Sequence, residues 1–230
     1  MNRISLVFAA VALASVACYA QPGTENTSYQ LGYMSNLDKA DAVVNFTNFG
    51  STFAFGLPAP ATTFGNLCAN VYVFDPQEEL ISCCSCLVTP NGLNSLSAKG
   101  DLISNTLTPA TPTSIVVKIV GTLALDVNGT FFSALPDTFC NPTTINDPTK
   151  TFPVNALLAW GTNNHVDSTG GLALTELKFR SALLLPPAAP GATPNEIDQL
   201  ATFCRFNQIN GTGFGVCKAC INNGRGAAKH

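Results

Sequence analysis

The cysteines constrain the fold of this chain more than any other feature. The sequence has nine, and Cys18 lies in an N-terminal segment that we expect to be removed. The remaining eight are an even number, as expected when thiols pair in an oxidising compartment. Sequence spacing does not decide the pairing. We therefore predict up to four disulfides among Cys68, Cys83, Cys84, Cys86, Cys140, Cys204, Cys217 and Cys220.

Residues 1–20 have the pattern of a secretory signal peptide. Arg3 supplies the positive charge, 4–17 are apolar, and Ala20 with the small Cys18 suits cleavage after position 20. This run is shorter than the roughly 20 apolar residues that a membrane span requires, and no later segment reaches that length. The sequence therefore predicts a secreted, extracellular protein without a membrane span in the mature chain, with a periplasmic or surface-attached location as the alternative.

A lipoprotein is a second interpretation of the same segment. Residues 15–18 resemble a lipobox, in which Cys18 would carry lipid and become the N-terminus. Ser15 stands where that motif has leucine, so we favour the ordinary signal peptide.

Charge is sparse along the chain. Charged residues make up 11% of the sequence, against roughly 25% in a typical globular protein, and the formal net charge is −3. There is no basic cluster to attract nucleic acid or anionic lipid. We therefore predict neither as a partner.

Alternating apolar and polar residues predict a β domain over 41–185. In 41–47, apolar side chains recur at every second position, which is the period of a half-buried strand. The stretch 113–125 is apolar on both faces and predicts a central strand. Further strands are predicted for 93–98, 154–160 and 172–185, where the last also has a helix-forming composition. Loops are predicted for 137–153, tethered by Cys140, and for 161–171, and Asn128-Gly129 predicts a hairpin turn.

The clearest local structure is a hairpin. Residues 67–74 and 80–88 are β-rich and flank a turn that contains Asp-Pro. With a four-residue turn, Cys68 lies opposite Ser85. A turn that differs by one residue places Cys68 opposite Cys84 or Cys86. A bridge from Cys68 to one of these two is therefore our predicted pairing.

Two further expectations concern the other cysteines. Cys83 and Cys84 are neighbours on a strand and point to opposite faces, so they should belong to different bridges. Cys204 bridged to Cys217 or Cys220 would clamp the C-terminal helix to the chain that follows it.

The pattern changes after the β domain. Residues 21–40 before it are polar and are predicted to be a flexible leader, and 186–194 are a proline-rich linker. Thr193-Pro194-Asn195-Glu196 has the form of a capping box with proline at the first helical position, and it predicts a helix that ends near 210. We assign 195–221 to this helix and a cysteine-clamped tail, and 222–230 to a disordered end.

Candidate catalytic and metal-binding groups are few. Cys217 and Cys220 have the spacing of a redox pair or half a zinc site, and 83–86 with Cys68 could hold zinc or an iron–sulfur cluster. The oxidising compartment favours structural disulfides instead. His165 lies in a polar loop, and Glu78 with its neighbour Glu79 lies in the hairpin turn, where such side chains face water. We predict no catalytic residue, metal or cofactor.

Two segments resemble a group of secreted bacterial proteins with a shared cysteine motif. The first is NLCANVYVFD followed by ELISCCSC, over 66–75 and 79–86. The second begins at Cys204 and includes NGTGFGVCKAC over 210–220. No activity is established for that group, so the resemblance implies a bacterial secreted protein and transfers no catalytic residue.

The expected fold is mainly β: a disulfide-linked β-sandwich, immunoglobulin-like or similar, with one C-terminal α-helix. We expect a non-enzymatic extracellular protein, a cell-surface, matrix or filament subunit that acts by self-association or adhesion through exposed sheet edges. One alternative is a secreted carbohydrate-binding module or hydrolase, for which Trp160, Tyr72 and Phe214 would contact the sugar. Another is an envelope thiol–disulfide protein that uses Cys217 and Cys220.

Overall fold

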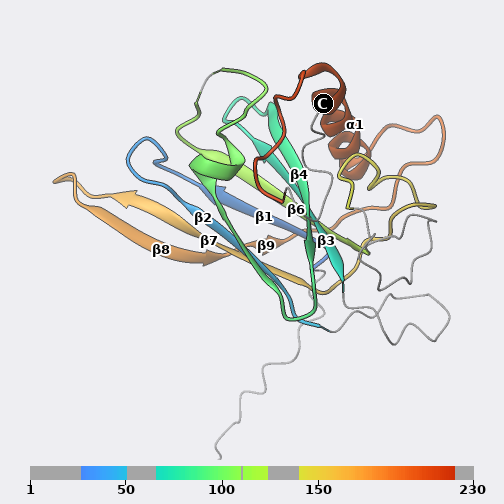
Figure 1. The fold of residues 1–230 in the computed structure, drawn as a ribbon, viewed down its shortest axis with the longest axis horizontal. Helices are drawn as coiled ribbons and strands as arrows, with labels where there is room; N and C mark the ends of the chain where they lie inside the picture. The colour runs from blue at the N-terminus through green and yellow to red at the C-terminus, as the bar shows by residue number, and fades with distance from the viewer. Residues whose placement is uncertain (1–26, 51–65, 110, 124–139, 221–230) are drawn as a thin grey trace, which may run out of the picture.

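Two antiparallel sheets and one α-helix make up the structure, a computed structural model that describes residues 27–50, 66–109, 111–123 and 140–220. The strand order is β4-β3-β6-β1-β9 in one sheet and β5-β2-β7-β8 in the other (Figure 1). The elements are β1 (Tyr29–Met34), β2 (Val43–Asn48), β3 (Leu67–Phe74), β4 (Leu80–Val88), β5 (Leu93–Ser97), the π-helical turn η1 (Ala98–Leu102), β6 (Ile115–Leu123), β7 (Leu157–Val166), β8 (Leu172–Lys178), β9 (Arg180–Ser181) and α1 (Glu196–Asn210). The prediction of a mainly β chain with one helix is confirmed.

The two sheets share one hydrophobic core. Val44 and Phe46 of β2 enter it from the four-stranded sheet, and Val71 of β3 and Val117 of β6 enter it from the other. All four side chains are fully buried. Burial of such a side chain contributes about 1.5–3 kcal/mol each, so the alternating apolar residues of β2 help to hold the two sheets together.

The other face of the five-stranded sheet is covered by α1. Tyr72 of β3 and Val120 of β6 pack there against Ile197 and Leu200 of the helix. Strand β6 is therefore buried on both faces, and the prediction of a central strand over 113–125 is confirmed. The hairpin of β3 and β4, strand β5 and the strand character of β8 are confirmed as well.

The N-cap of the helix lies two residues after Thr193, the N-cap that the expected capping box implies. The N-cap is Asn195, whose side chain accepts a hydrogen bond from the N–H of Asp198 at 3.4 Å, and the Asp198 carboxylate accepts the N–H of Asn195 at 3.2 Å. The reciprocal pair uses asparagine, which is a strong N-cap residue, in place of Thr193. The C-terminal end at Asn210 agrees with the prediction.

The flexible leader predicted over 21–40 is wrong for Tyr29–Met34, which form strand β1 between β6 and β9. Its alternating pattern is hidden because Gln30 occupies a buried position. The Gln30 amide donates to the Leu157 carbonyl at 2.7 Å and accepts the Ala159 N–H at 2.9 Å, so this polar side chain links the two sheets.

The predicted loop over 161–171 is also wrong in its first half, because β7 continues to Val166. Two buried asparagines concealed this strand. Asn163 accepts hydrogen bonds from the N–H and hydroxyl of Ser35, and Asn164 donates to the carbonyl of Ala40 at 3.0 Å. The expectations for 1–26, for the Asn128-Gly129 turn and for 222–230 lie outside the described residues.

Candidate functional site

Four cysteine pairs lie at disulfide distance. They are Cys68–Cys140, Cys83–Cys204, Cys84–Cys217 and Cys86–Cys220. The predictions of four bridges and of separate bridges for Cys83 and Cys84 are confirmed. This number of disulfides is typical of proteins from oxidising compartments.

Two predicted pairings are wrong. The register of the hairpin is irregular between Val73 and Phe74, which places Cys68 opposite Leu87. Cys68 instead joins Cys140. Cys204 does not bridge to the tail that follows the helix, because it lies on the buried face of α1, against β4.

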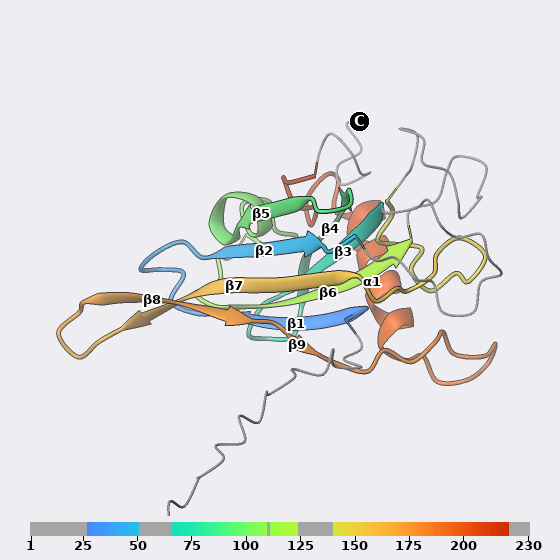
Figure 2. The same ribbon diagram turned by 90° about the horizontal axis from the view of Figure 1, so that it is seen from below.

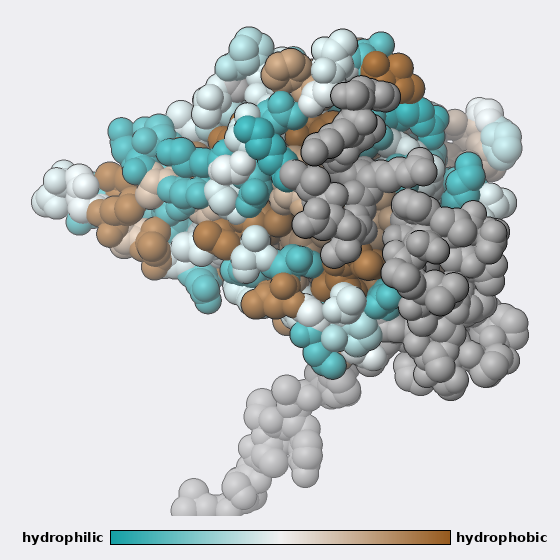
Figure 3. All heavy atoms as spheres, viewed as in Figure 1, coloured by the Kyte–Doolittle hydropathy of each residue, from teal (hydrophilic) through white to brown (hydrophobic). Residues whose placement is uncertain are grey.

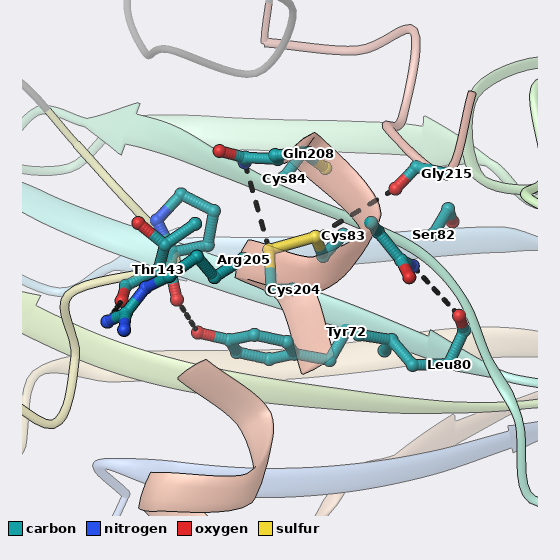
Figure 4. The surroundings of a disulfide bond; sticks show 12 residues. Tyr72, Leu80, Ser82, Cys83, Cys84, Thr143, Cys204, Arg205, Gln208 and Gly215 are labelled. Carbon is teal, nitrogen blue, oxygen red and sulfur yellow. Dashed lines mark hydrogen bonds between the residues drawn. A yellow bond between two sulfur atoms is a disulfide. The ribbon is translucent and has the colours of Figure 1, made fainter. Parts of the chain in front are cut away.

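The side-chain alternation of β4 explains the remaining bridges. Cys83 points to the face covered by α1 and joins Cys204, whereas Cys84 and Cys86 point into the core between the sheets. In that core Cys84 and Cys86 meet the tail, which runs beside β4. Figure 4 shows the surroundings of the Cys83–Cys204 bridge. The N–H of Cys83 donates to the Gly215 carbonyl of the tail at 3.1 Å, and the Asn207 amide of the helix donates to the Leu80 carbonyl of β4 at 2.8 Å, so helix, tail and strand are tied together. The tail therefore covers part of the free edge of β4.

Redox and metal chemistry receive no support from this arrangement. Cys217 and Cys220 are bonded to Cys84 and Cys86 of β4 and not to each other. Within 27–50, 66–109, 111–123 and 140–220, no three histidine, cysteine or acidic side chains form a group that could hold a metal ion.

The three aromatic residues expected to contact a sugar do not come together. Tyr72 is fully buried beneath α1, and its hydroxyl donates to the Pro142 carbonyl at 2.6 Å. Trp160 is half-buried in β7 of the other sheet. Phe214 is exposed in the tail, beside a shallow surface hollow that includes Asn105 and Pro109.

An open groove of about 530 Å³ lies between the first turns of α1 and the end of β3. Lys118 lines it, donates to the Glu196 carboxylate at 2.6 Å and lies over the ring of Phe74, 4.5 Å from its centre. The Tyr29 hydroxyl donates to the same Glu196 oxygen at 3.0 Å. Burial, followed by the charge of Glu196, raises the pKa of Tyr29 far above its usual range. The network anchors the N-terminal end of the helix to the sheet.

The buried phenols predict a loss of stability at high pH. Burial also raises the pKa of Tyr72. In the unfolded chain both phenols ionise near pH 10, so above that pH the unfolded state binds fewer protons and the free energy of unfolding falls as the pH rises. Tyr29→Phe should make this fall shallower in urea titrations followed by circular dichroism between about pH 8 and 11. Exposed Tyr33→Phe is the control, and an equally shallow fall in that variant would contradict the explanation.

Strands β7 and β8 form a hairpin arm that extends beyond the other strands (Figures 1 and 2). All seven residues of β8 are exposed. Leu172, Leu174 and Leu177 are each about half exposed, at 48, 59 and 50%. Apolar surface accordingly lies along this end of the molecule in Figure 3.

The turn of the arm is ordered by Asp167. Its Oδ1 accepts the N–H and the hydroxyl of Thr169, at 2.8 and 2.7 Å, and the N–H of Gly171 at 2.7 Å. The hydrogen bond from the Thr169 side chain, followed by those from backbone N–H groups, lowers the pKa of the Asp167 carboxyl. Gly170 has a φ of +84°, which glycine adopts without strain. The arm is thus held in shape by its own bonds.

The free edge of β8 differs from the other three sheet edges. The tail covers part of β4, β9 has only two residues, and β5 is a five-residue strand with mostly polar side chains. Short, polar or covered edges are how proteins avoid unwanted strand pairing. Strand β8 carries Glu176 and Lys178, but it is seven residues long, exposed, and has three half-exposed leucines, so it is the least protected of the four edges that the described residues form.

His165 of β7 lies on the arm rather than in a loop. It is exposed, and its Nε2 lies 2.8 Å from the hydroxyl of Thr175. Glu78 and Glu79 are exposed in the turn between β3 and β4. Sequence reasoning missed the leucines of the arm. Their signal was that both faces of 172–178 carry leucine, while one of them also carries Glu176 and Lys178, which suits neither a central strand nor an ordinary edge strand.

No protein-family model, no curated protein and no solved structure matches this chain. In the part of the chain that the structure describes, no helix is long and apolar enough to cross a membrane.

Proposed function

We propose that this protein is a non-enzymatic extracellular structural protein, a cell-surface, matrix or filament subunit that acts by self-association. The observation that carries the proposal is the edge of β8, with seven exposed residues and three half-exposed leucines. Such an edge offers backbone N–H and C=O groups for pairing with another strand. The two sheets with their common core support describing the subunit as a β-sandwich.

Low charge and disulfides suit this role. A chain with 11% charged residues has little repulsion to oppose the approach of identical copies. The bridges tie the helix and tail to β4, on the sheet that does not contain the arm. The subunit is therefore cross-linked where it must stay folded, while its apolar edge is exposed.

The alternatives have less support. A sugar site built on Trp160, Tyr72 and Phe214 loses Tyr72 to burial. A thiol–disulfide role for Cys217 and Cys220 would require them to form a bridge with each other, and both are bonded to β4.

Leu174→Glu should weaken self-association. A glutamate at the exposed edge replaces apolar contact and adds a second negative charge beside Glu176, so like charges come close together when two copies pair through β8. Loss of one buried leucine is worth about 1.5–3 kcal/mol, which corresponds to about tenfold or more in the dissociation constant. Analytical ultracentrifugation of the mature wild-type and variant proteins would measure the dissociation constant.

Leu183→Glu is the matched control, because Leu183 is 74% exposed and lies outside the sheets. It should leave the association unchanged. A wild-type protein that sediments as a monomer up to its solubility limit would refute the proposed function.

A further inference from the structure

The hydrogen bonds of the arm determine which β8 residues face its free edge. The N–H of Asp167 donates to the Gly171 carbonyl, and the N–H of Phe179 donates to the Ala159 carbonyl, both at 2.9 Å. These bonds lie at the two ends of the β7–β8 register, and both β8-side residues are odd-numbered. Bonded and non-bonded pairs alternate along an antiparallel ladder. Even-numbered residues such as Leu174 and Glu176 therefore direct their backbone N–H and C=O groups away from β7.

We propose that two copies of the chain pair through β8, antiparallel to each other, about a two-fold axis that passes through Thr175. The inference rests on the proposed function and names its partner. Leu174 then lies opposite the partner's Glu176, and these even-numbered residues exchange backbone hydrogen bonds. Thr175 lies opposite its own copy as a non-hydrogen-bonded pair, which agrees with the alternation derived above.

Length and charge favour this register over its neighbours. It pairs β8 along its whole length, Leu172–Lys178, without including the turn at Gly170 or the buried Phe179. A shift that centres the pair on Glu176 would place two carboxylates face to face, and like charges directly opposite each other are destabilising. A shift toward the turn leaves the end of each strand unpaired.

A second copy suits the side chains of the strand. Ala173 lies opposite the partner's Leu177 on one face, and the two Leu174 side chains are diagonal neighbours on the other. Glu176 gives each strand a negative charge and Lys178 gives it a positive one, so the pair has no net charge to oppose it. The same edge meets itself, so the association is isologous and closed. The product is a dimer with a continuous sheet across both subunits, and a filament would need a second contact.

Cysteine cross-linking tests the register. Thr175→Cys should form a covalent dimer under mild oxidation, because non-hydrogen-bonded antiparallel pairs have Cα atoms about 4.5 Å apart, within the range for a disulfide. Ala173→Cys is the matched control on the same face. In the proposed register, position 173 of one copy lies four residues along the strand from position 173 of the other. This variant alone should therefore not form a covalent dimer.

A mixture of Ala173→Cys with Leu177→Cys should cross-link, which provides a second test if Thr175→Cys does not fold. Non-reducing gels would measure the dimer, and peptide mapping would confirm that the new cysteine forms the bridge. Wild-type dimers in ultracentrifugation with no cross-link at Thr175 or in the mixture would overturn the register and leave the proposed function standing. Monomeric wild type with no cross-link in any variant would overturn both.

Discussion

Replacing Cys68 and Cys140 together with alanine is expected to lower the free energy of unfolding by about 4 kcal/mol, the largest effect of any single bridge. The two cysteines are 72 residues apart, and a bridge stabilises mainly by restricting the unfolded chain, more so for longer loops. No other bridge closes this loop, since the other three all join β4 to residues of α1 and the tail.

Those three bridges should be partly redundant. Cys84 and Cys217 are 133 residues apart, yet Cys83–Cys204 and Cys86–Cys220 already hold the same two segments together. Removing Cys84–Cys217 therefore releases only a short additional loop, which corresponds to about 2 kcal/mol.

The Cys84–Cys217 variant is also the matched control for the first prediction. The sulfurs of both bridges are buried, so the cost of the cavities left by alanine is similar. Urea denaturation of the two double variants under non-reducing conditions compares them directly. Equal losses, or a larger loss for Cys84–Cys217, would show that loop entropy does not govern the stability of this protein.

Much of the sheet structure could be predicted because its residues follow a simple period. Val44 and Phe46 face the core while Asn45 does not, and Ile115, Val117 and Ile119 are all buried between the sheets. Where a buried polar residue breaks the period, prediction failed. Gln30 in β1 and Asn163 and Asn164 in β7 are satisfied by bonds to distant residues, which local patterns do not reveal.

The pairing of the cysteines and the exposure of the arm depend on tertiary structure. A register shift next to Phe74 moved Cys68 away from its expected partners. The strand predicted for 172–185 forms, but Ala173 and Leu177 are exposed, and of 172–179 only Phe179 is buried. The sequence does not show that the chain leaves one sheet and joins the other at that residue.

Phe179 is the residue at which the chain changes sheets. Lys178 pairs with Trp160 in the four-stranded sheet, and Arg180 pairs with Leu31 in the other. Phe179 is 2% exposed, and its ring packs against Gly32 and Gly161. A Cβ added at Gly32 would lie 2.2 Å from the ring, so both the aromatic residue and the glycine are needed for this contact.

Phe179→Ala is expected to lower the free energy of unfolding by about 3–5 kcal/mol, because it leaves a cavity between the sheets. Gly32→Ala should cost about 1–3 kcal/mol through overpacking against the ring. In the double variant the added methyl group meets no ring, so the combined loss should be smaller than the sum of the two. Urea denaturation of the three variants measures this coupling, with exposed Phe49→Ala expected to change stability by less than about 0.5 kcal/mol. Strictly additive losses would mean that the ring and Gly32 do not contact each other, and that the crossing between the sheets is held by other residues.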